Sequence, residues 1–115
     1  MHEFSLCQNI VSIVSNKAGD NDINVKDIVI KVGDIAGVDL DSLCFWFPVV
    51  IKDTNLRDAE LKVIHQHALA KCNMCNKDFA IKQLYESCPE CHSYDKQVIS
   101  GQELTVESII YKQEK

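Results

Sequence analysis

The sequence predicts an α+β fold in which two helices pack on a small, about three-stranded β-sheet, with a zinc-ribbon-like module inserted before the last strand. Two observations predict it. Apolar residues recur with a helical period in two stretches and with a two-residue period in others. Four cysteines stand in two Cys-x-x-Cys pairs, Cys72 with Cys75 and Cys88 with Cys91. With 115 residues and 46% hydrophobic composition, the chain has room for one domain that carries a small module.

The first helix is expected from Ser5 to Ala18. Its apolar positions recur every three or four residues: Leu6, Ile10, Ile13 and Val14. Ser5 and Gln8 have the spacing of a capping box, which would place the start of the helix at Ser5. A helix that begins closer to residue 2 is the alternative. The Gly-Asp-Asn sequence at 19–21 should end the helix.

A strand is expected next, over Val25–Val32, because this stretch is rich in β-branched residues. Alternate side chains should line one of its faces: Ile28, Ile30 and Val32. Residues 33–37, with a glycine at each end, should form a loop.

The second helix should begin at Asp39 or Asp41, either of which can cap its first turn. Its apolar positions are Leu40, Leu43, Cys44 and Phe47. Pro48 interrupts this pattern, because its ring clashes with the carbonyl of Cys44. We therefore expect a kink or an early end at this point.

Two further strands are expected, over Glu60–His67 and Leu104–Tyr111. One face of the last strand should carry Leu104, Val106 and Ile110. This strand must pair with an earlier one to satisfy its backbone groups. The cysteines would then lie in a module at 72–99, inserted into a domain made of 1–71 plus 100–115.

The four cysteines can place four thiolates tetrahedrally around a structural zinc ion. Two disulfides are the alternative, but no secretory signal is recognisable, and a reducing cytoplasm is expected. An iron site of the rubredoxin type uses similar cysteine spacing, so iron remains an alternative to zinc. His92, directly after Cys91, is either a solvated neighbour or an alternative ligand that replaces a thiolate in acid.

Other reactive residues fit structural roles. Cys7 and Cys44 fall on apolar helix faces and are assigned to packing. His65 and His67 lie two apart on a strand and could hold a metal, although a solvated pair is the better expectation. The sequence contains no phosphate-binding glycine loop, Ser-His-Asp order or zinc-protease motif, so no enzyme is expected.

The net charge of −5 bears on possible partners. The segment between Cys72 and Ser100 contains three lysines and four acidic residues. The module therefore lacks the basic surface with which zinc ribbons bind nucleic acid. No apolar stretch is long enough to span a membrane. A protein partner or a metal ion is compatible with the acidic balance.

The chain opens with Met1, His2 and Glu3. A free α-amine, backbone amide nitrogens and the imidazole of His2 can close small chelate rings around one ion. Nitrogen donors in this planar spacing suit Ni²⁺ or Cu²⁺. On its own, a histidine at position 2 is usually a matter of chance.

Taken together, these motifs resemble the HypA/HybF family of hydrogenase nickel-incorporation proteins. The resemblance rests on Met1-His2-Glu3 before an apolar helix, on the Val-Gly-Asp-Ile-Ala-Gly-Val-Asp sequence at 32–39, on the cysteine pairs, and on the Gly-Gln-Glu-Leu sequence at 101–104. It covers essentially the whole chain. The triplet is a weak signal alone, but its combination with the cysteine pairs at this length is specific.

The resemblance implies a nickel metallochaperone. It implies that Met1, His2 and Glu3 hold Ni²⁺ as cargo, with Asp39, or else Asp41, as an approaching carboxylate. It implies a structural Zn²⁺ at the cysteines that communicates with the nickel site. The expected partners are a nickel-insertion GTPase accessory protein and the large subunit of [NiFe]-hydrogenase, and for some members urease accessory proteins.

Two positions depart from the family pattern. Asn76 follows Cys75 where some members have a second histidine, so an exchange of zinc ligands at both pairs is not expected. Pro48 falls where the second helix of the family usually continues. Three competing functions are a zinc-ribbon interaction module without a nickel role, an iron electron carrier, and a nucleic-acid-binding ribbon.

Overall fold

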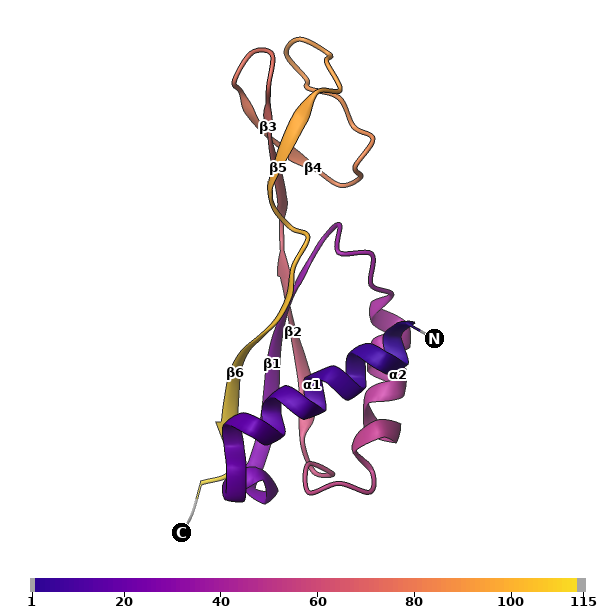
Figure 1. Ribbon diagram of the computed structural model, residues 1–115, viewed down its shortest axis with the longest axis vertical. Coiled ribbons are helices and arrows are strands. Elements are labelled where there is room, and N and C mark those ends of the chain that lie inside the picture. Colours follow the sequence, from indigo (N-terminus) through magenta and orange to yellow (C-terminus); the bar gives the residue numbers. More distant parts are fainter. Residues whose placement is uncertain (1, 114–115) are drawn as a thin grey trace. The chain divides into compact units, whose positions relative to one another are not determined.

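The computed structural model describes residues 2–113 and confirms the α+β class (Figure 1). A short 3-10 helix, Gly19–Asn24, follows the first α-helix. The other elements are α1 (His2–Ala18), β1 (Val25–Gly33), α2 (Leu40–Ile51), β2 (Glu60–Gln66), β3 (Ala68–Cys72), β4 (Asp78–Ile81), β5 (Lys96–Ser100) and β6 (Leu104–Tyr111). Two three-stranded sheets form, one in the order β2-β1-β6 and one in the order β4-β3-β5.

The chain divides into two compact units. The helical unit comprises Met1–Ile30, Val38–Ile64 and Thr105–Lys115. The cysteine unit comprises Lys31–Gly37 and His65–Leu104. The expected division into an inserted module at 72–99 and a surrounding domain stays a prediction. In the described part of the chain, no helix is long and apolar enough to cross a membrane.

Helix α1 begins at His2, so Ser5 lies inside the helix and the expected capping box at Ser5 and Gln8 is wrong. The fully buried residues follow one helical stripe: Cys7, Ile10 and Val14. Ile13 lies off this stripe and is 43% exposed, although its spacing had suggested a core position.

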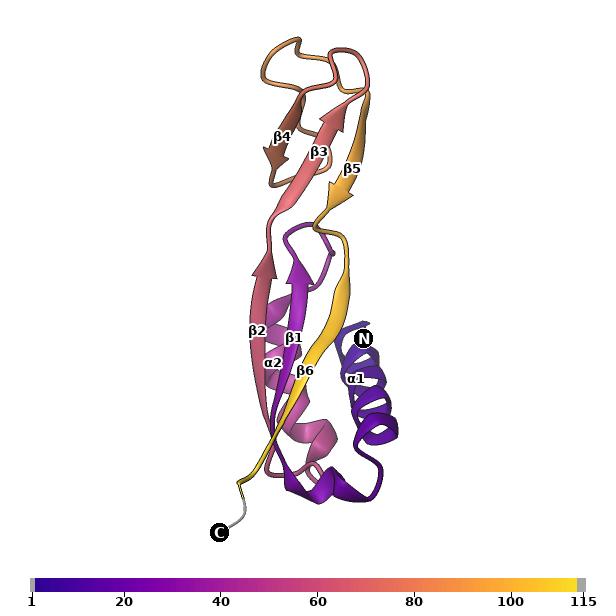
Figure 2. The same cartoon turned by 90° about the vertical axis from the view of Figure 1, so that its left-hand side faces the viewer.

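Strand β1 is the central strand of the helical unit's sheet. Its alternation is as expected, with Ile28, Ile30 and Val32 all buried. In this unit α1 and α2 cover the same face of the sheet, as Figures 1 and 2 show. Burial of large apolar side chains between helices and strands is therefore what holds this unit together.

Helix α2 is capped by Asp39, one of the two expected residues. Its Oδ1 accepts hydrogen bonds from the backbone N–H groups of Asp41 (3.1 Å) and Ser42 (3.3 Å). Such a cap satisfies donors that have no partner inside the helix.

The helix does not end at Pro48 but continues to Ile51, so the expected early end is wrong. Pro48 cannot donate a hydrogen bond to the carbonyl of Cys44. Residues on both sides of it are buried, Phe47 before and Ile51 after, and their packing outweighs the lost bond. The assignment of Cys44 to the core is also wrong, because its side chain is exposed.

The last strand changes phase along its length. Leu104 and Val106 are half-buried as expected, but Ile109 and Tyr111 replace Ile110 on the inner side. Ile110 is 44% exposed. The burial along β6 therefore does not follow one strict alternation, since the half-buried positions change phase between Val106 and Ile109.

The cysteine unit is built on β3, which pairs antiparallel with β4 and β5. The register is regular against β4 and shifts against β5 between Leu69 and Ala70. Its small core contains Ala68, Ala70, Cys72, Phe79, Ile81 and Cys88. Figure 2 shows β3 between its two partners. Strands β3 and β4 had not been predicted.

Two glycines of this unit, Gly33 and Gly101, allow their backbone segments to lie close together. A Cβ atom on Gly33 would overlap the carbonyl group of Gly101. Gly101 itself has a φ of +101°, and a Cβ there would lie 2.5 Å from the Cα of Ala68. Both positions therefore require glycine. The approach lets the N–H of Ile35 donate to the carbonyl of Gly101 at 2.9 Å.

Candidate metal centres

The two cysteine pairs lie in turns that have the same backbone conformation and hydrogen bond. In the first, the N–H of Asn76 donates to the carbonyl of Cys72, and in the second the N–H of His92 donates to the carbonyl of Cys88, both at 2.9 Å. Asn76 and His92 each have a φ of 63°. Asparagine and histidine are among the residues that enter this left-handed region more readily than most. His92 thus has the same backbone role as Asn76.

Further hydrogen bonds close the turns and join them. The N–H of Cys72 donates to the carbonyl of Lys77, and that of Cys88 to the carbonyl of Ser93, each at 2.9 Å. Asn73 links the first turn to the second, because its backbone N–H and its side-chain amide both donate to Asp95, at 3.0 and 2.9 Å. The pairs are therefore brought together by the backbone and not by the sulfur atoms alone.

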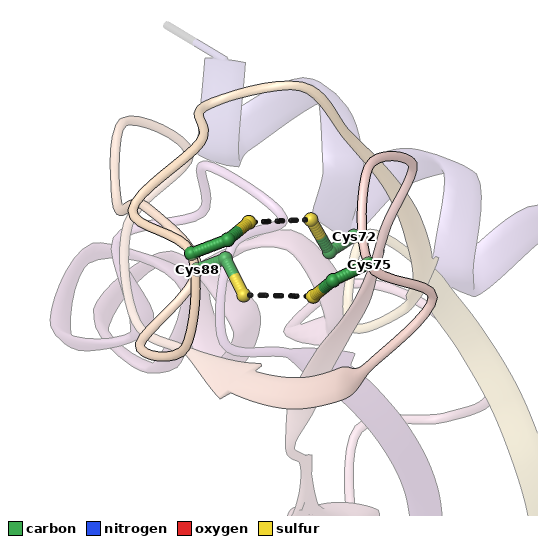
Figure 3. Close-up of side chains that lie close together, drawn as sticks. Cys72, Cys75 and Cys88 are labelled. Carbon is green, nitrogen blue, oxygen red and sulfur yellow. Dashed lines mark hydrogen bonds between the residues drawn. The ribbon is translucent and has the colours of Figure 1, made fainter.

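The four sulfur atoms form one compact group (Figure 3). They all lie within 4.8 Å of one another. Two of the distances run between the pairs. The Sγ atoms of Cys72 and Cys91 are 3.5 Å apart, and those of Cys75 and Cys88 are 3.6 Å apart. A tetrahedral zinc with ~2.3 Å bonds would separate its sulfur ligands by roughly 3.8 Å. The arrangement therefore fits a zinc site made of four cysteine thiolates.

Backbone N–H groups stabilise the thiolate form of two of these residues. The N–H groups of Cys75 and Met74 lower the pKa of Cys72 to about 7. Those of Cys91 and Glu90 likewise lower the pKa of Cys88. Since zinc binds thiolates and not thiols, these donors favour metal binding near neutral pH.

Cys7 contrasts with this group. Burial raises the pKa of its thiol to about 11, with the nearby Cys44 and Glu3 adding to the effect. Its Sγ donates to the carbonyl of Leu43 at 3.5 Å. The thiol therefore stays protonated and joins α1 to α2, which confirms its assignment to packing.

Among the described residues, the four cysteines are the only group of three or more potential ligands. His65 and His67 do not form a second group. His67 is largely exposed, and its Nδ1 lies 3.4 Å from Oδ2 of Asp34.

The amino-terminal candidates are described only in part. Met1 lies outside the described residues, and of His2 only the backbone, in α1, is described. Glu3 lies beside the start of α2, where its Oε2 accepts a hydrogen bond from the backbone N–H of Asp39 at 3.2 Å. This bond brings together two acidic candidates that are 36 residues apart in the sequence.

An aromatic contact supports the same juxtaposition. Phe4 meets Trp46 edge to face, with ring centroids 5.4 Å apart. Such pairs stabilise beyond the area they bury. Sequence reasoning missed both residues, because nothing in their spacing indicates that they touch.

The helical unit has two helices on a three-stranded sheet, and the cysteine unit has two turns that together hold four cysteines. These features define a metal-binding α+β protein. A family profile described as "HypA: Hydrogenase/urease nickel incorporation, metallochaperone, hypA" matches residues 1–111. The chain therefore belongs to the HypA family of nickel metallochaperones for hydrogenase and urease maturation. Members of this family carry a metal and do not catalyse a reaction, which confirms that no enzyme is to be expected.

Two relatives match this chain along nearly their whole length. The hydrogenase maturation factor HypA of Francisella philomiragia is 48% identical over 111 residues, covering 96% of this chain and 99% of that protein. That of Legionella pneumophila is 35% identical over 111 residues, covering 96% of this chain and 98% of that protein.

Solved structures confirm the fold. The chain superposes on the solution structure of the Ni metallochaperone HypA from Helicobacter pylori with a TM-score of 0.68, at 20% identity, covering 97% of this chain and 98% of that one. A second solution structure of a HypA protein gives 0.68 at 22% identity, covering 96% of each chain.

Proposed function

We propose that the chain binds its Ni²⁺ cargo at the amino terminus, through the α-amine of Met1, backbone amide nitrogens and the imidazole of His2. Glu3 assists, and Asp39 supplies a further carboxylate. Planar nitrogen donors of this kind match the tetragonal preference of Ni²⁺. We also assign a resident structural zinc to Cys72, Cys75, Cys88 and Cys91.

The contact between Glu3 and Asp39 carries the nickel proposal. It places the cap of α2 against the first turn of α1, beside the residue that follows His2. Carboxylates at a helix N-terminus also have a purely structural use, because they satisfy its N–H donors. The two uses are separable by experiment, since a serine hydroxyl can still cap the helix but does not supply the carboxylate proposed to bind the metal.

The two sites suit different roles for their metals. Four thiolates complete a tetrahedron around zinc and leave no open position for exchange. A terminal site made of nitrogen and oxygen donors is reached easily by an acceptor. Its ligands must lose protons to bind, so nickel affinity should fall as the pH falls.

We further propose that the nickel is delivered to the large subunit of [NiFe]-hydrogenase in the cytoplasm, together with a nickel-insertion GTPase accessory protein, and that urease accessory proteins are additional partners. The family description names both hydrogenase and urease. Reduced thiols, which the zinc site needs, are consistent with that compartment.

Replacing His2 tests the nickel site directly. His2→Ala removes the imidazole and its chelate ring, and should weaken Ni²⁺ binding more than about a hundredfold, beyond what loss of a supporting residue costs. Calorimetry on the untagged, zinc-loaded chain measures this. His65→Ala is a matched control that should bind nickel normally, and zinc content should be unchanged in both variants.

An extension by one residue before Met1 tests the α-amine. It moves the amine out of the chelate and should be nearly as damaging as His2→Ala. Equal nickel affinity in the extended and original chains would exclude the amine as a ligand. Unchanged affinity in His2→Ala would leave the zinc-ribbon interaction module as the better function.

A further inference from the structure

Trp46 is the single tryptophan of the chain and lies where α2 meets the first turn of α1. Its indole ring meets two other rings edge to face. The first is Phe4 of α1, with centroids 5.4 Å apart, and the second is Phe45 of α2, with centroids 5.1 Å apart. Trp46 is only half-buried. It therefore joins the two helices at the margin of the core and not inside it.

The first turn of α1 needs support from outside the helix. The first four N–H groups of a helix have no acceptor within it, so a first turn frays unless other contacts hold it. The fully buried stripe of α1 begins only at Cys7, and the side chains at 3–6 are half-buried or exposed. Core packing therefore stops about one turn short of the residues that carry the proposed nickel ligands.

Contacts with two points of α2 hold this turn. Glu3 accepts the backbone N–H of Asp39, at the start of α2, at 3.2 Å. Phe4 contacts Trp46, which lies about two helical turns, or roughly 10 Å, further along α2. A contact at one point alone would leave the turn free to swing about it. Contacts at two separated points fix both the position and the direction of the turn.

The two contacts differ in how well they can hold the turn. The hydrogen bond from Asp39 to Glu3 is exposed to water, which competes with it, and its acceptor is the carboxylate that is proposed to assist the nickel. The contact between Phe4 and Trp46 uses no group that binds a metal. Aromatic pairs in this edge-to-face geometry also stabilise beyond the area that they bury. The ring contact can therefore hold the turn both before and after the metal arrives.

We propose that Trp46 is a positioning residue of the nickel site, an inference that rests on the proposed function. Its indole holds Phe4, and with it the first turn of α1, so that the carboxylates of Glu3 and Asp39 stand together before nickel binds. The nitrogen donors of residues 1 and 2 are adjacent in the sequence and close their chelate rings without this help. The two carboxylates come from different helices and converge only when the first turn is packed against α2. Because they are ordered in advance, less freedom is lost when the metal binds.

Calorimetry with Ni²⁺ on the untagged, zinc-loaded chain tests this role. Trp46→Ala should weaken nickel binding about tenfold, because the carboxylates then meet in only a small fraction of the free chains. Trp46→Phe keeps an aromatic ring and should retain most of the affinity. Val49→Ala is the matched control on the same helix, since Val49 is 50% exposed, and should leave the affinity unchanged. Equal nickel affinities of Trp46→Ala and the original chain would overturn the proposal.

A double variant separates positioning from a purely structural role. Asp39→Ser removes one of the two carboxylates but keeps a cap for α2. Trp46→Ala added to Asp39→Ser should weaken nickel binding by less than about twofold further, since the carboxylate that Trp46 helps to place is already gone. If the two losses instead add in full, Trp46 acts on the site by another route and the proposal is wrong.

The order of the first turn can also be measured without nickel. In Trp46→Ala the backbone carbon shifts of residues 3–6 should lose their helical values, while those of 7–18 keep theirs and establish that the variant folds. Helical shifts retained at 3–6 would contradict the proposal. The two proposals fail differently. Nickel affinity that His2→Ala leaves unchanged overturns the nickel site itself, whereas affinity that His2→Ala lowers and Trp46→Ala does not overturns only the role of Trp46.

Discussion

The two units differ in what their cores contain. In the helical unit the fully buried side chains are mostly large: Phe47, Ile10, Ile28, Ile30, Leu43 and Leu56. The core of the cysteine unit has only two large residues, Phe79 and Ile81, among alanines and cysteines. Small cores seldom supply enough apolar burial to fold unaided, and a bound metal commonly completes them. One unit is thus held by apolar packing, and we expect the other to depend on the zinc proposed at its four cysteines.

Removing zinc should have the largest effect and should separate the units. Structural zinc contributes an apparent ~10–16 kcal/mol, which is coupled to folding. Chelation, or Cys88→Ser, should therefore unfold the cysteine unit while Trp46, in the helical unit, keeps its native fluorescence. Amide spectra recorded with and without chelator would measure both. If the amides of β3, β4 and β5 stay dispersed without zinc, apolar packing suffices there too.

Creating a cavity in the core of the helical unit should have the next largest effect on stability. Phe47 is 2% exposed, and Phe47→Ala should lower the free energy of unfolding by about 3–5 kcal/mol. Urea unfolding followed by Trp46 fluorescence measures it. Val49→Ala, on the open side of the same helix, should cost much less. Loss of zinc from the Phe47 variant would mean that the two units do not fold independently.

Two substitutions of Asp39 should have smaller effects and sharpen the contrast between structural and cargo sites. Asp39→Ala should lower stability by about 1 kcal/mol, because the cap is lost. Asp39→Ser keeps a capping oxygen and should cost almost nothing. Both remove the carboxylate, so both should weaken Ni²⁺ binding equally by calorimetry. If Asp39→Ser binds nickel as tightly as the original chain, Asp39 is a cap and no ligand.

The smallest effect should come from His92→Asn. Asparagine already occupies the equivalent position of the first turn, Asn76, with the same φ of 63°. Zinc affinity and the pH at which acid releases zinc should both stay unchanged. A shift of the release curve in this variant would show that the imidazole takes part in metal binding, and would support the interpretation of His92 as an alternative ligand.

Periodicity predicted the helical unit well. The stretches that became α1, β1, the start of α2 and β6 all carry apolar patterns eight or more residues long, so the dominant period is unambiguous. Strands β3 and β4 have only five and four residues, and their inward side chains include alanines, which leave no clear alternation. Their pairing is dictated by the cysteine turns, which lie outside any local pattern.

Rules about single residues failed where tertiary packing opposed them. Pro48 stays inside α2 because buried residues anchor the helix on both sides. Cys44 is exposed because α2 has more apolar residues than its unit can enclose, so composition did not indicate which side faces inward. In β6 the half-buried position is Ile109 and not Ile110, a change of phase that regular alternation cannot anticipate.

The two candidate sites differ in the same way. The cysteines were predictable because each pair is local and its spacing matches the geometry of a turn. The approach of Asp39 to Glu3 depends on the packing of two helices, so Asp39 was named as a nickel ligand only through the family resemblance. Phe4 and Trp46, which support that approach, carry no motif at all.

The division into units has a consequence for the gene. The chain passes from one unit to the other four times, after residues 30, 37, 64 and 104, so neither unit is a continuous segment. A stop codon between β5 and β6 leaves all of α1 intact but removes one of the three strands of the sheet that α1 covers. A lesion at the carboxyl end of the coding sequence should therefore also disturb the helix that carries the proposed amino-terminal nickel site.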